Sequence, residues 1–455
     1  MSSIRLAHVA VIVSLLLLAA ASAGEVEARL ELKFAARRAE VFERVEITVT
    51  GVPPAANPFD PESIALDLQV TPPSGMRLQV PGFFHREFDR KLEGEREVLT
   101  PRGEGGWRIR CLPLEPGPHR LIATVTLGGK SAARGEAVLE VSAGTRHGLV
   151  RIEPEGQRYF RLDDGTPLFL NGLCACWHGS RGTYDYDDWL EAYRQAGMNY
   201  LKHDDVIAWH RDLGRHLRSI DPYRHLVSSS FTGGSERPDL FALPEMDFAQ
   251  YHSYNEKHPA RITAERAARF FEKYQKPFFV SEYGTDWKGW KPDTDPHFRA
   301  LHQAIWSGAF TGAAGTGMTW WWENIHTGNL YGHWSALAAF LEGTGIGRAD
   351  LQRARFENTE NSVTPFGVAA RDEAFVWLLD RAHDWPDGAM DANPAPVAGA
   401  KVTLMGVNDG LWAIEWWDTR AGKRVADREA TASGGTLRLE PPAFQVDIAG
   451  RLKKR

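Results

Sequence analysis

The first part of the chain alternates apolar and polar residues with a period of two. Apolar side chains take every second position in the runs 45–49, 107–111 and 121–127, and proline and glycine residues separate such runs. Short alternating strands with these turns predict an antiparallel β-sandwich, which we place at residues 25–145. No cluster of acids or histidines in it suggests catalysis. A packing or spacer module is therefore favoured over a sugar-binding one.

From residue 150 to 350 the pattern changes to strands that alternate with helices, which favours a parallel sheet, most simply a barrel. Each predicted helix shows an apolar stripe at helical spacing. The predicted strands are 168–173, 198–202, 225–229, 248–252, 278–284 and a run that begins at Gly317. The helical stripes are Trp189, Leu190, Tyr193 and Ala196; Trp209, Leu213, Leu217 and Ile220; and Ala267, Phe270, Phe271 and Tyr274, followed by a helix over 298–309.

Alternation with a period of two returns between residues 356 and 450. Trp412, Ile414 and Trp416 stand on one side of a predicted strand, and a turn follows at 419–422. The pattern predicts a second, smaller β domain. Its aromatic residues could bind glycan, but a sheet that packs on the barrel explains them more simply.

The strand at 278–284 carries the most informative acid of the chain. Glu282 follows a short apolar run and precedes Tyr283 and Gly284. If the side chains alternate, Phe278 and Val280 share a face with Glu282, which is delivered to the carboxyl end of the strand. Barrel enzymes keep their catalytic residues at that end.

The first 23 residues predict a signal peptide. Arg5 precedes an apolar run from Val9 to Ala21, and small residues before Gly24 fit a cleavage site. The run is short for a membrane span. We expect a secreted or periplasmic protein without stable membrane insertion after cleavage; a retained N-terminal anchor is the alternative.

The composition narrows the classes of partner. The chain has 455 residues, enough for two or three domains, and a formal net charge of −6. Nothing in it suggests nucleic acid as a partner. The cysteines, Cys111, Cys174 and Cys176, read as buried small residues. No histidine spacing supports a metal site, and no cofactor is expected.

Several short motifs, taken in order, resemble exported bacterial (β/α)8 glycoside hydrolases related to glycoside hydrolase family 5. The N-terminal domain is similar to the domain of unknown function 5060, which precedes such barrels. The resemblance covers nearly all of the chain after the signal peptide. The motifs are 163–169, Asn171-Gly172, 209–212, 219–225, His252-Ser253-Tyr254, 281–284 and the tryptophan run 320–322, with 81–84 and 107–110 in the first domain.

The resemblance implies a retaining glycosidase in which Glu282 is the nucleophile. His252 and Tyr254 would then hydrogen-bond the nucleophile and the sugar. Such an enzyme forms a glycosyl ester at one carboxylate, while a second carboxylate about 5 Å away donates and then accepts a proton. Two structural alternatives remain open: Glu282 as a salt-bridged acid at a strand end, and His252 as a core histidine.

The resemblance also implies the residues that hold the substrate, an oligosaccharide or polysaccharide. Trp321 or Trp322, on the eighth strand, would form the floor of the subsite beside the scissile bond. Asn171 and Trp177, on and after the first strand, are further candidates for substrate binding.

The pattern departs from the family after Lys202, where strands, helices and the acid/base are not recognisable. From Thr166 to Gly347 the segment falls well short of the about 250 residues typical of the barrel. Asp204 and Asp205 are the weak candidates for the acid/base. The expected fold is α/β plus all-β: an incomplete TIM (β/α)8-type barrel flanked by an N-terminal β-sandwich and a C-terminal β-sheet domain.

The leading hypothesis is a secreted glycoside hydrolase-like protein that acts on β-linked glycans, with Glu282 as nucleophile and no recognisable acid/base. The alternatives are a non-catalytic carbohydrate-binding protein and a deletion product of an active glycosidase.

Overall fold

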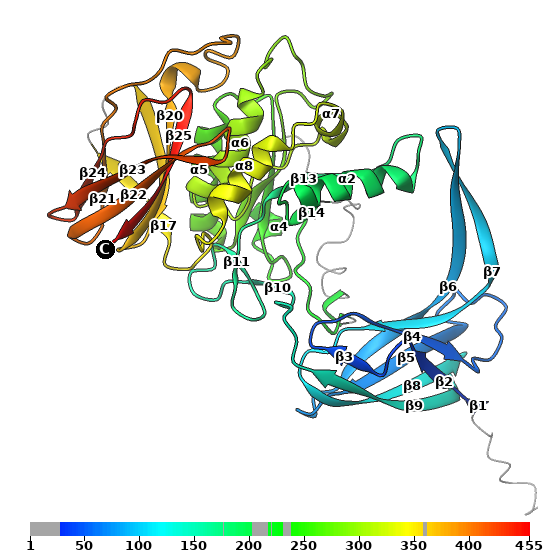
Figure 1. The fold of residues 1–455 in the computed structure, drawn as a ribbon. Coiled ribbons are helices and arrows are strands. Elements are labelled where there is room, and N and C mark those ends of the chain that lie inside the picture. Colours follow the sequence, from blue (N-terminus) through cyan, green and yellow to red (C-terminus); the bar gives the residue numbers. More distant parts are fainter. Residues whose placement is uncertain (1–27, 176, 203–216, 220, 231–237, 358–361) are drawn as a thin grey trace, which may run out of the picture. The chain divides into compact units, whose positions relative to one another are not determined.

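The computed structural model describes residues 28–175, 177–202, 217–219, 221–230, 238–357 and 362–455. The chain divides into two compact units. The first comprises the residues up to Asp89 together with Leu99–Arg146, and the second comprises Arg90–Val98 together with His147–Arg455. Both units can be followed by colour in Figure 1. The predicted signal peptide lies outside the described residues.

The first unit is one nearly closed sheet whose strands run in the order β1-β9-β8-β5-β6-β7-β4-β2, with β3 beside β9. Most pairs are antiparallel, and the predicted alternation is confirmed: Ile47, Ile109 and Leu121 are fully buried. The strands are β1 (Ala28–Arg29), β2 (Glu31–Phe34), β3 (Arg38–Glu40), β4 (Val45–Thr50), β5 (Ile64–Thr71), β6 (Leu78–Glu93), β7 (Arg96–Cys111), β8 (Gly117–Leu127) and β9 (Lys130–Ser142).

The second unit opens with a small antiparallel sheet and then forms two parallel strand pairs. The antiparallel strands are β10 (Val150–Ile152), β11 (Phe160–Leu162) and β12 (Pro167–Leu168). β13 (Gly172–Cys174) pairs with β14 (Tyr200–Lys202), and β15 (Ala249–Tyr254) pairs with β16 (Phe278–Gly284).

The segment 314–320 joins these two pairs into one parallel sheet. On one side the amide of Cys174 donates to the carbonyl of Thr319 at 3.1 Å, and on the other the amide of Met318 donates to the carbonyl of Val280 at 3.0 Å. Both bridges of the segment, Leu170 with Gly315 and Tyr283 with Thr319, are parallel. The order is therefore β14, β13, segment 314–320, β16, β15.

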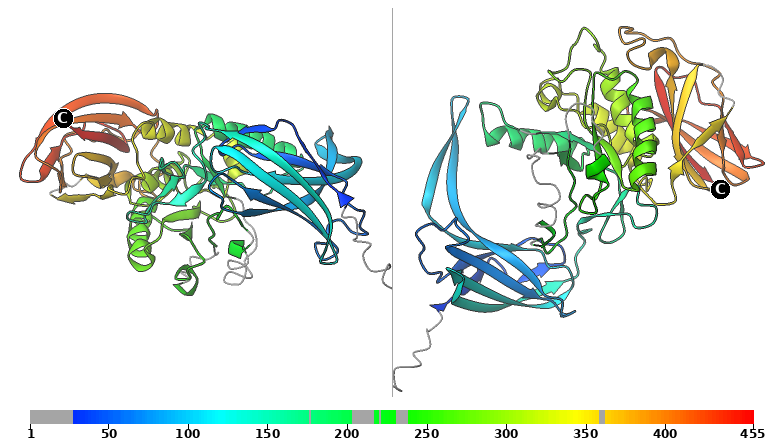
Figure 2. Two further views of the ribbon diagram at one scale, coloured as in Figure 1. Left: turned by 90° about the horizontal axis from the view of Figure 1, so that it is seen from below. Right: turned by 180° about the vertical axis from the view of Figure 1, so that it is seen from behind.

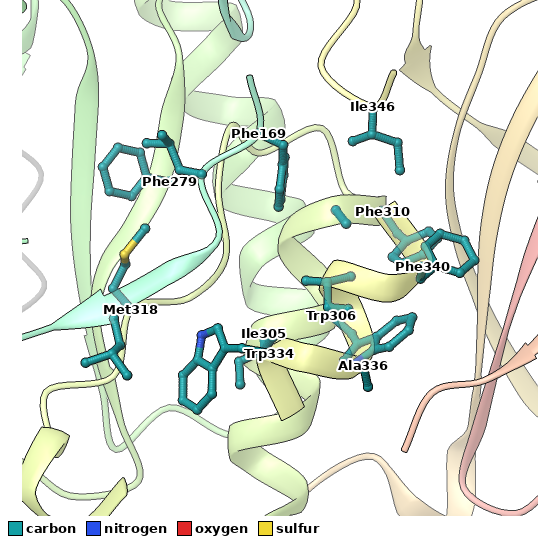
Figure 3. Close-up of a cluster of buried hydrophobic side chains, with 14 of the residues drawn as sticks. Phe169, Phe279, Ile305, Trp306, Phe310, Met318, Trp334, Ala336, Phe340 and Ile346 are labelled. Carbon is teal, nitrogen blue, oxygen red and sulfur yellow. The ribbon is translucent and has the colours of Figure 1, made fainter. Parts of the chain in front are cut away.

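Helices cover this sheet and form the centre of the core. α6 is buried along its whole length, and Trp306 and Phe310 on it pack against Phe340 of α8 (Figure 3). The helices are α2 (Thr183–Gln195), α4 (Pro238–Phe241), α5 (Pro259–Tyr274), α6 (Arg299–Phe310), α7 (Trp322–Thr327) and α8 (Gly332–Leu341).

The C-terminal part has two sheets, in the orders β17-β19-β20-β25-β22-β23 and β18-β21-β24. Trp412 and Trp416 are buried between them, while Trp377 faces α6, 6.2 Å from the ring of Phe310. The larger sheet thus packs on the helices through Trp377, whereas Trp412 and Trp416, which were expected to pack on a barrel, lie between the two sheets (Figure 2). The strands are β17 (Gln352–Arg353), β18 (Arg355–Glu357), β19 (Val363–Ala369), β20 (Glu373–Asp380), β21 (Val402–Met405), β22 (Gly410–Asp418), β23 (Lys423–Ala432), β24 (Thr436–Leu439) and β25 (Asp447–Lys454), with a 3-10 turn, η1 (Arg381–His383).

Three local predictions are wrong. Residues 225–229 form no regular strand; Val227 donates its amide to a side-chain oxygen of Asp247 instead of to a ladder. Trp322 begins α7 rather than extending a strand. Leu190, in the predicted stripe of α2, is 46% exposed.

The parallel sheet and its covering helices agree with an α/β core between β domains. A closed or incomplete TIM barrel does not follow from the described strands. The predicted stripe Trp209, Leu213, Leu217 and Ile220 falls mostly outside the described residues.

Candidate functional site

The candidate site lies where the parallel strands reach their carboxyl ends. β15 ends with His252, Ser253 and Tyr254, and β16 ends with Glu282, Tyr283 and Gly284. His252 pairs with Glu282 across the ladder. Because parallel strands present their carboxyl ends at one edge of a sheet, these side chains meet the loops that follow β13 and the segment 314–320.

A β-bulge in β16 decides which way Glu282 points. Tyr251 pairs with Val280, but the next pair is His252 with Glu282, so Ser281 is the extra residue. Phe278, Val280 and Tyr283 pack in the cluster formed with α5 and α6, whereas Phe279 packs in the opposite cluster. Glu282 therefore shares the face of Phe279, and the predicted common face with Phe278 and Val280 is wrong, because the extra residue reverses the alternation.

Glu282 is held by two side chains from β15. The hydroxyl of Tyr254 donates to Oε2 of Glu282 at 2.8 Å, and Nδ1 of His252 lies 3.1 Å from the same oxygen. Glu282 and His252 are each 4% exposed. A buried carboxylate needs such donors to offset its lost hydration. The structure thus brings together the three residues that the resemblance assigned to the nucleophile and its partners.

Trp321 lies against the end of β16. Its Nε1 donates to the carbonyl of Asp286 at 3.0 Å. A Cβ atom on Gly284 would stand 2.7 Å from Cζ2 of Trp321, so the close approach requires glycine at this position. Trp321 is buried, at 6% exposure, and contacts β16 at Gly284, two residues after Glu282.

Trp177 and Trp322 belong to an aromatic cluster over the start of α7. The ring of Trp177 is 5.6 Å from Trp320 and 6.1 Å from Trp322, in edge-to-face geometry. Trp322 is buried, and Trp177 is 60% exposed. Trp320 was missed by sequence reasoning, although the run of three tryptophans contained it.

The remaining predicted residues lie elsewhere. The side-chain Nδ2 of Asn171 donates to the carbonyl of Gly197 at 3.3 Å. The backbone N–H of Asn171 donates to Oδ1 of Asn199 at 2.9 Å. Asn171 precedes β13, so it lies toward the amino end of the sheet, away from Glu282. Asp204 and Asp205 lie outside the described residues.

Two of the three cysteines, Cys111 and Cys174, lie in the described part of the chain. Cys111 and Cys174 are buried, as predicted, and burial raises the pKa of the Cys111 thiol to about 12. Sγ of Cys174 donates to the carbonyl of Ser281, the bulge residue, at 3.2 Å. Cys176 is not among the described residues. Within the described part of the chain, no three His, Cys, Asp or Glu side chains could together hold a metal ion.

Neither a protein-family profile nor a curated protein sequence matches the chain. Among solved structures it is similar to "a putative glycoside hydrolase from Bacteroides vulgatus", with 13% identity, 92% of this chain and 100% of that chain covered, and a TM-score of 0.54. A "putative beta-galactosidase" from Bacteroides fragilis matches with 11% identity, 91% and 69% coverage, and a TM-score of 0.32. At this identity the first likeness shows only that the two chains share a fold.

Proposed function

We propose that this protein is a glycan-processing protein of the glycoside hydrolase type, acting on β-linked glycans by a retaining mechanism with Glu282 as nucleophile. The observation that carries the proposal is the buried carboxylate of Glu282, which Tyr254 and His252 contact at the carboxyl end of a parallel sheet. The glycosidase-like fold supports it. We further propose that the parallel sheet with its helices is related to glycoside hydrolase family 5 and the first domain to the domain of unknown function 5060.

In the proposed reaction, a carboxylate oxygen of Glu282 attacks the anomeric carbon as the bond to the leaving oxygen breaks. Tyr254 and His252 fix the carboxylate in one orientation, which favours attack because the reacting atoms are already aligned. The resulting ester is then hydrolysed by water. Trp321 would border the subsite beside Glu282, and the exposed Trp177 would stack on a more distant sugar ring.

The rate of glycan hydrolysis depends on a second carboxylate that acts as the acid/base. A retaining enzyme needs an acid/base about 5 Å from the nucleophile, and the candidates are Asp204 and Asp205. General acid assistance contributes about 10²–10⁴-fold. Without it, substrates with good leaving groups still form the ester at Glu282, while unactivated glycans turn over slowly.

A second candidate function is carbohydrate binding without catalysis. The observation that favours it is Trp177, which is 60% exposed and rests edge-to-face against Trp320 and Trp322. Exposed aromatic faces of this kind stack on sugars whether or not a nucleophile reacts. A deletion product of an active glycosidase would keep the same feature.

Covalent labelling tests the assignment. A 2-fluoro glycoside with a dinitrophenyl leaving group should add one glycosyl group to the protein, and peptide mass spectrometry should place it on Glu282. Glu282→Gln should abolish labelling, whereas Glu323→Gln, which changes an exposed acid on α7, should not. A label on another acid would reject Glu282. Binding of oligosaccharides without any labelling would favour the second candidate.

The proposed location is outside the cytoplasm, by way of the predicted signal peptide at 1–23. In the described part of the chain, no helix is long and apolar enough to cross a membrane. Cell fractionation, with N-terminal sequencing of the exported form, tests the proposal; a mature protein that begins near Gly24 is expected.

A further inference from the structure

A cavity that does not include Glu282 lies at the start of α6. It has a volume of about 870 Å³ and is formed by residues 296–299, the turn 418–420 after β22, and residues 442–448 at the start of β25. Ligand sites of small molecules usually have about 300–1,000 Å³. Prolines and phenylalanines supply much of its wall, and a few charged side chains stand among them.

Two arginines line this cavity. Arg299 is 3% exposed; its Nη2 donates to the carbonyl of Asp391, and its Nη1 has no hydrogen-bond partner among the described residues. Nη1 of Arg420 donates to the carbonyl of His297 at 3.4 Å. Burial lowers the pKa of both guanidiniums, and the charge of Arg420 lowers that of Arg299 further.

In the described part of the chain, neither of these arginines forms an ion pair with a carboxylate. Buried charges are costly unless they are paired, and Arg299 is buried with its Nη1 atom unpartnered, whereas Arg420 is exposed at the rim and has Asp447 near enough to raise its pKa. Guanidinium groups match carboxylate and phosphate oxygens in a fork geometry. The two side chains therefore form a site that an anionic group would complete.

Asp447 gives the cavity an acceptor. It is 5% exposed; Oδ1 accepts from the hydroxyl of Thr419 and lies 3.4 Å from Nε2 of His302, while Oδ2 has no partner among the described residues. Burial raises the pKa of Asp447, but His302 and Arg420 lower it more, so the group stays ionised at neutral pH. An ionised carboxylate only accepts hydrogen bonds, and a hydroxyl group of a ligand would supply the donor.

We propose that this cavity binds a hydroxylated carboxylate of monosaccharide size, namely a hexuronate. Its carboxylate lies between Arg299 and Arg420, and one of its hydroxyl groups donates to Oδ2 of Asp447. The choice of a sugar acid rests on the proposed function of the protein, whereas the site itself is independent of Glu282. Free hexuronate and the terminal residue of an acidic glycan share this chemistry.

Isothermal titration calorimetry of the full chain tests the proposal. The ligands are galacturonate, glucuronate, glucose and inorganic phosphate, with trigalacturonate to separate the two sources. We expect one hexuronate per chain, at least tenfold tighter than glucose or phosphate. Trigalacturonate should bind at least tenfold more tightly than the monosaccharide if the glycan is the natural source, and equally if the free acid is.

Arg420→Gln is the decisive variant. Arg420 lies on a turn, so its replacement should leave the fold intact, whereas Arg299 is buried in the core and its replacement would disturb the packing. We expect at least a tenfold loss of hexuronate affinity. Arg424→Gln is the matched control: it removes an arginine on β23 that pairs with Glu415 at 2.9 Å, outside the cavity, and should leave the affinity unchanged.

Three results would overturn the proposal: equal binding of glucose, equal binding of phosphate, or undiminished hexuronate affinity in Arg420→Gln. Glu282→Gln should bind hexuronate like the wild type. Covalent labelling therefore tests the role of Glu282, and calorimetry tests hexuronate binding in the cavity, independently of each other.

Discussion

The phenolic oxygen of Tyr254 lies 2.8 Å from Oε2 of Glu282, across the parallel pair β15 and β16. The bulge at Ser281 makes this contact possible, because it turns Glu282 to the face on which Tyr254 already stands. A carboxylate that accepts from a fixed hydroxyl keeps one orientation. That orientation is what a nucleophile requires.

The first prediction concerns Tyr254. Tyr254→Phe removes a hydrogen bond to a charged group, worth about 1.5–3 kcal/mol, so labelling at Glu282 should slow by about 10–150-fold while the protein stays folded. Stopped-flow release of dinitrophenol measures the rate. Tyr331→Phe, which removes a hydroxyl 2.9 Å from Nδ1 of His326, is the control and should label normally. An unchanged rate in Tyr254→Phe would remove this residue from the mechanism.

The second prediction concerns the leaving group. Dinitrophenyl glycosides should be cleaved measurably and unactivated β-glycans very slowly, because protonation matters least when the leaving group is already stable. Azide or formate should accelerate the turnover of the activated substrate. Rapid cleavage of a glycan, lost in Asp204→Asn or Asp205→Asn, would instead show that this segment supplies the acid.

The third prediction concerns the close approach at Gly284. Gly284→Ala places a methyl group 2.7 Å from the ring of Trp321 and 2.9 Å from the carbonyl of Asp286, so the neighbours must shift. We expect a loss of about 1–3 kcal/mol in the free energy of unfolding, measured by urea denaturation. Gly332→Ala, at the start of α8 where a Cβ atom meets nothing within 4 Å, should be neutral or slightly stabilising.

The fourth prediction concerns pH. Burial lowers the pKa of His302 and, more strongly, of His333, whose Nδ1 atoms lie 3.0 Å apart. In the unfolded chain both titrate near 6.5, so below that pH the unfolded state binds more protons and stability falls as the pH falls. The loss continues until the lowered folded pKa is reached.

His333→Gln should weaken this dependence. Each such histidine contributes up to about 1.4 kcal/mol per pH unit, so the melting temperature of the variant should fall less steeply than that of the wild type between pH 6.5 and 5. His178→Gln, which changes an exposed side chain, should keep the wild-type slope. Parallel slopes for all three proteins would contradict the assignment.

The sequence predicted the elements whose periodicity is regular. Ile47 and Leu121 are buried as the alternation required, and α6 begins at Arg299, within one residue of the expected start. The contact of Tyr254 and His252 with Glu282 was predicted from the resemblance to a known family. The spacing along the chain could not predict it, because the residues are about thirty positions apart.

The failures have local physical causes. A bulge is an insertion of one residue, and nothing in the apolar run before Glu282 distinguishes Ser281 from an ordinary strand position. Trp322 suits a strand by propensity, but tertiary packing against Trp177 and Trp189 places it at the start of a helix. Asn171 was predicted to lie on a strand over 168–173, whereas in the structure the regular strand β13 begins at Gly172, one residue later.

The segment 314–320 has a consequence for the order of folding. Gly172 receives its partner Thr316 only 144 residues later in the chain. The closure entropy of so long a loop must be overcome before the central sheet forms, and such long-range pairing is slow. A chain that emerges from the ribosome therefore keeps β13 unpaired on that side until more than two thirds of it has been synthesised, which leaves time for a chaperone to capture it unfolded.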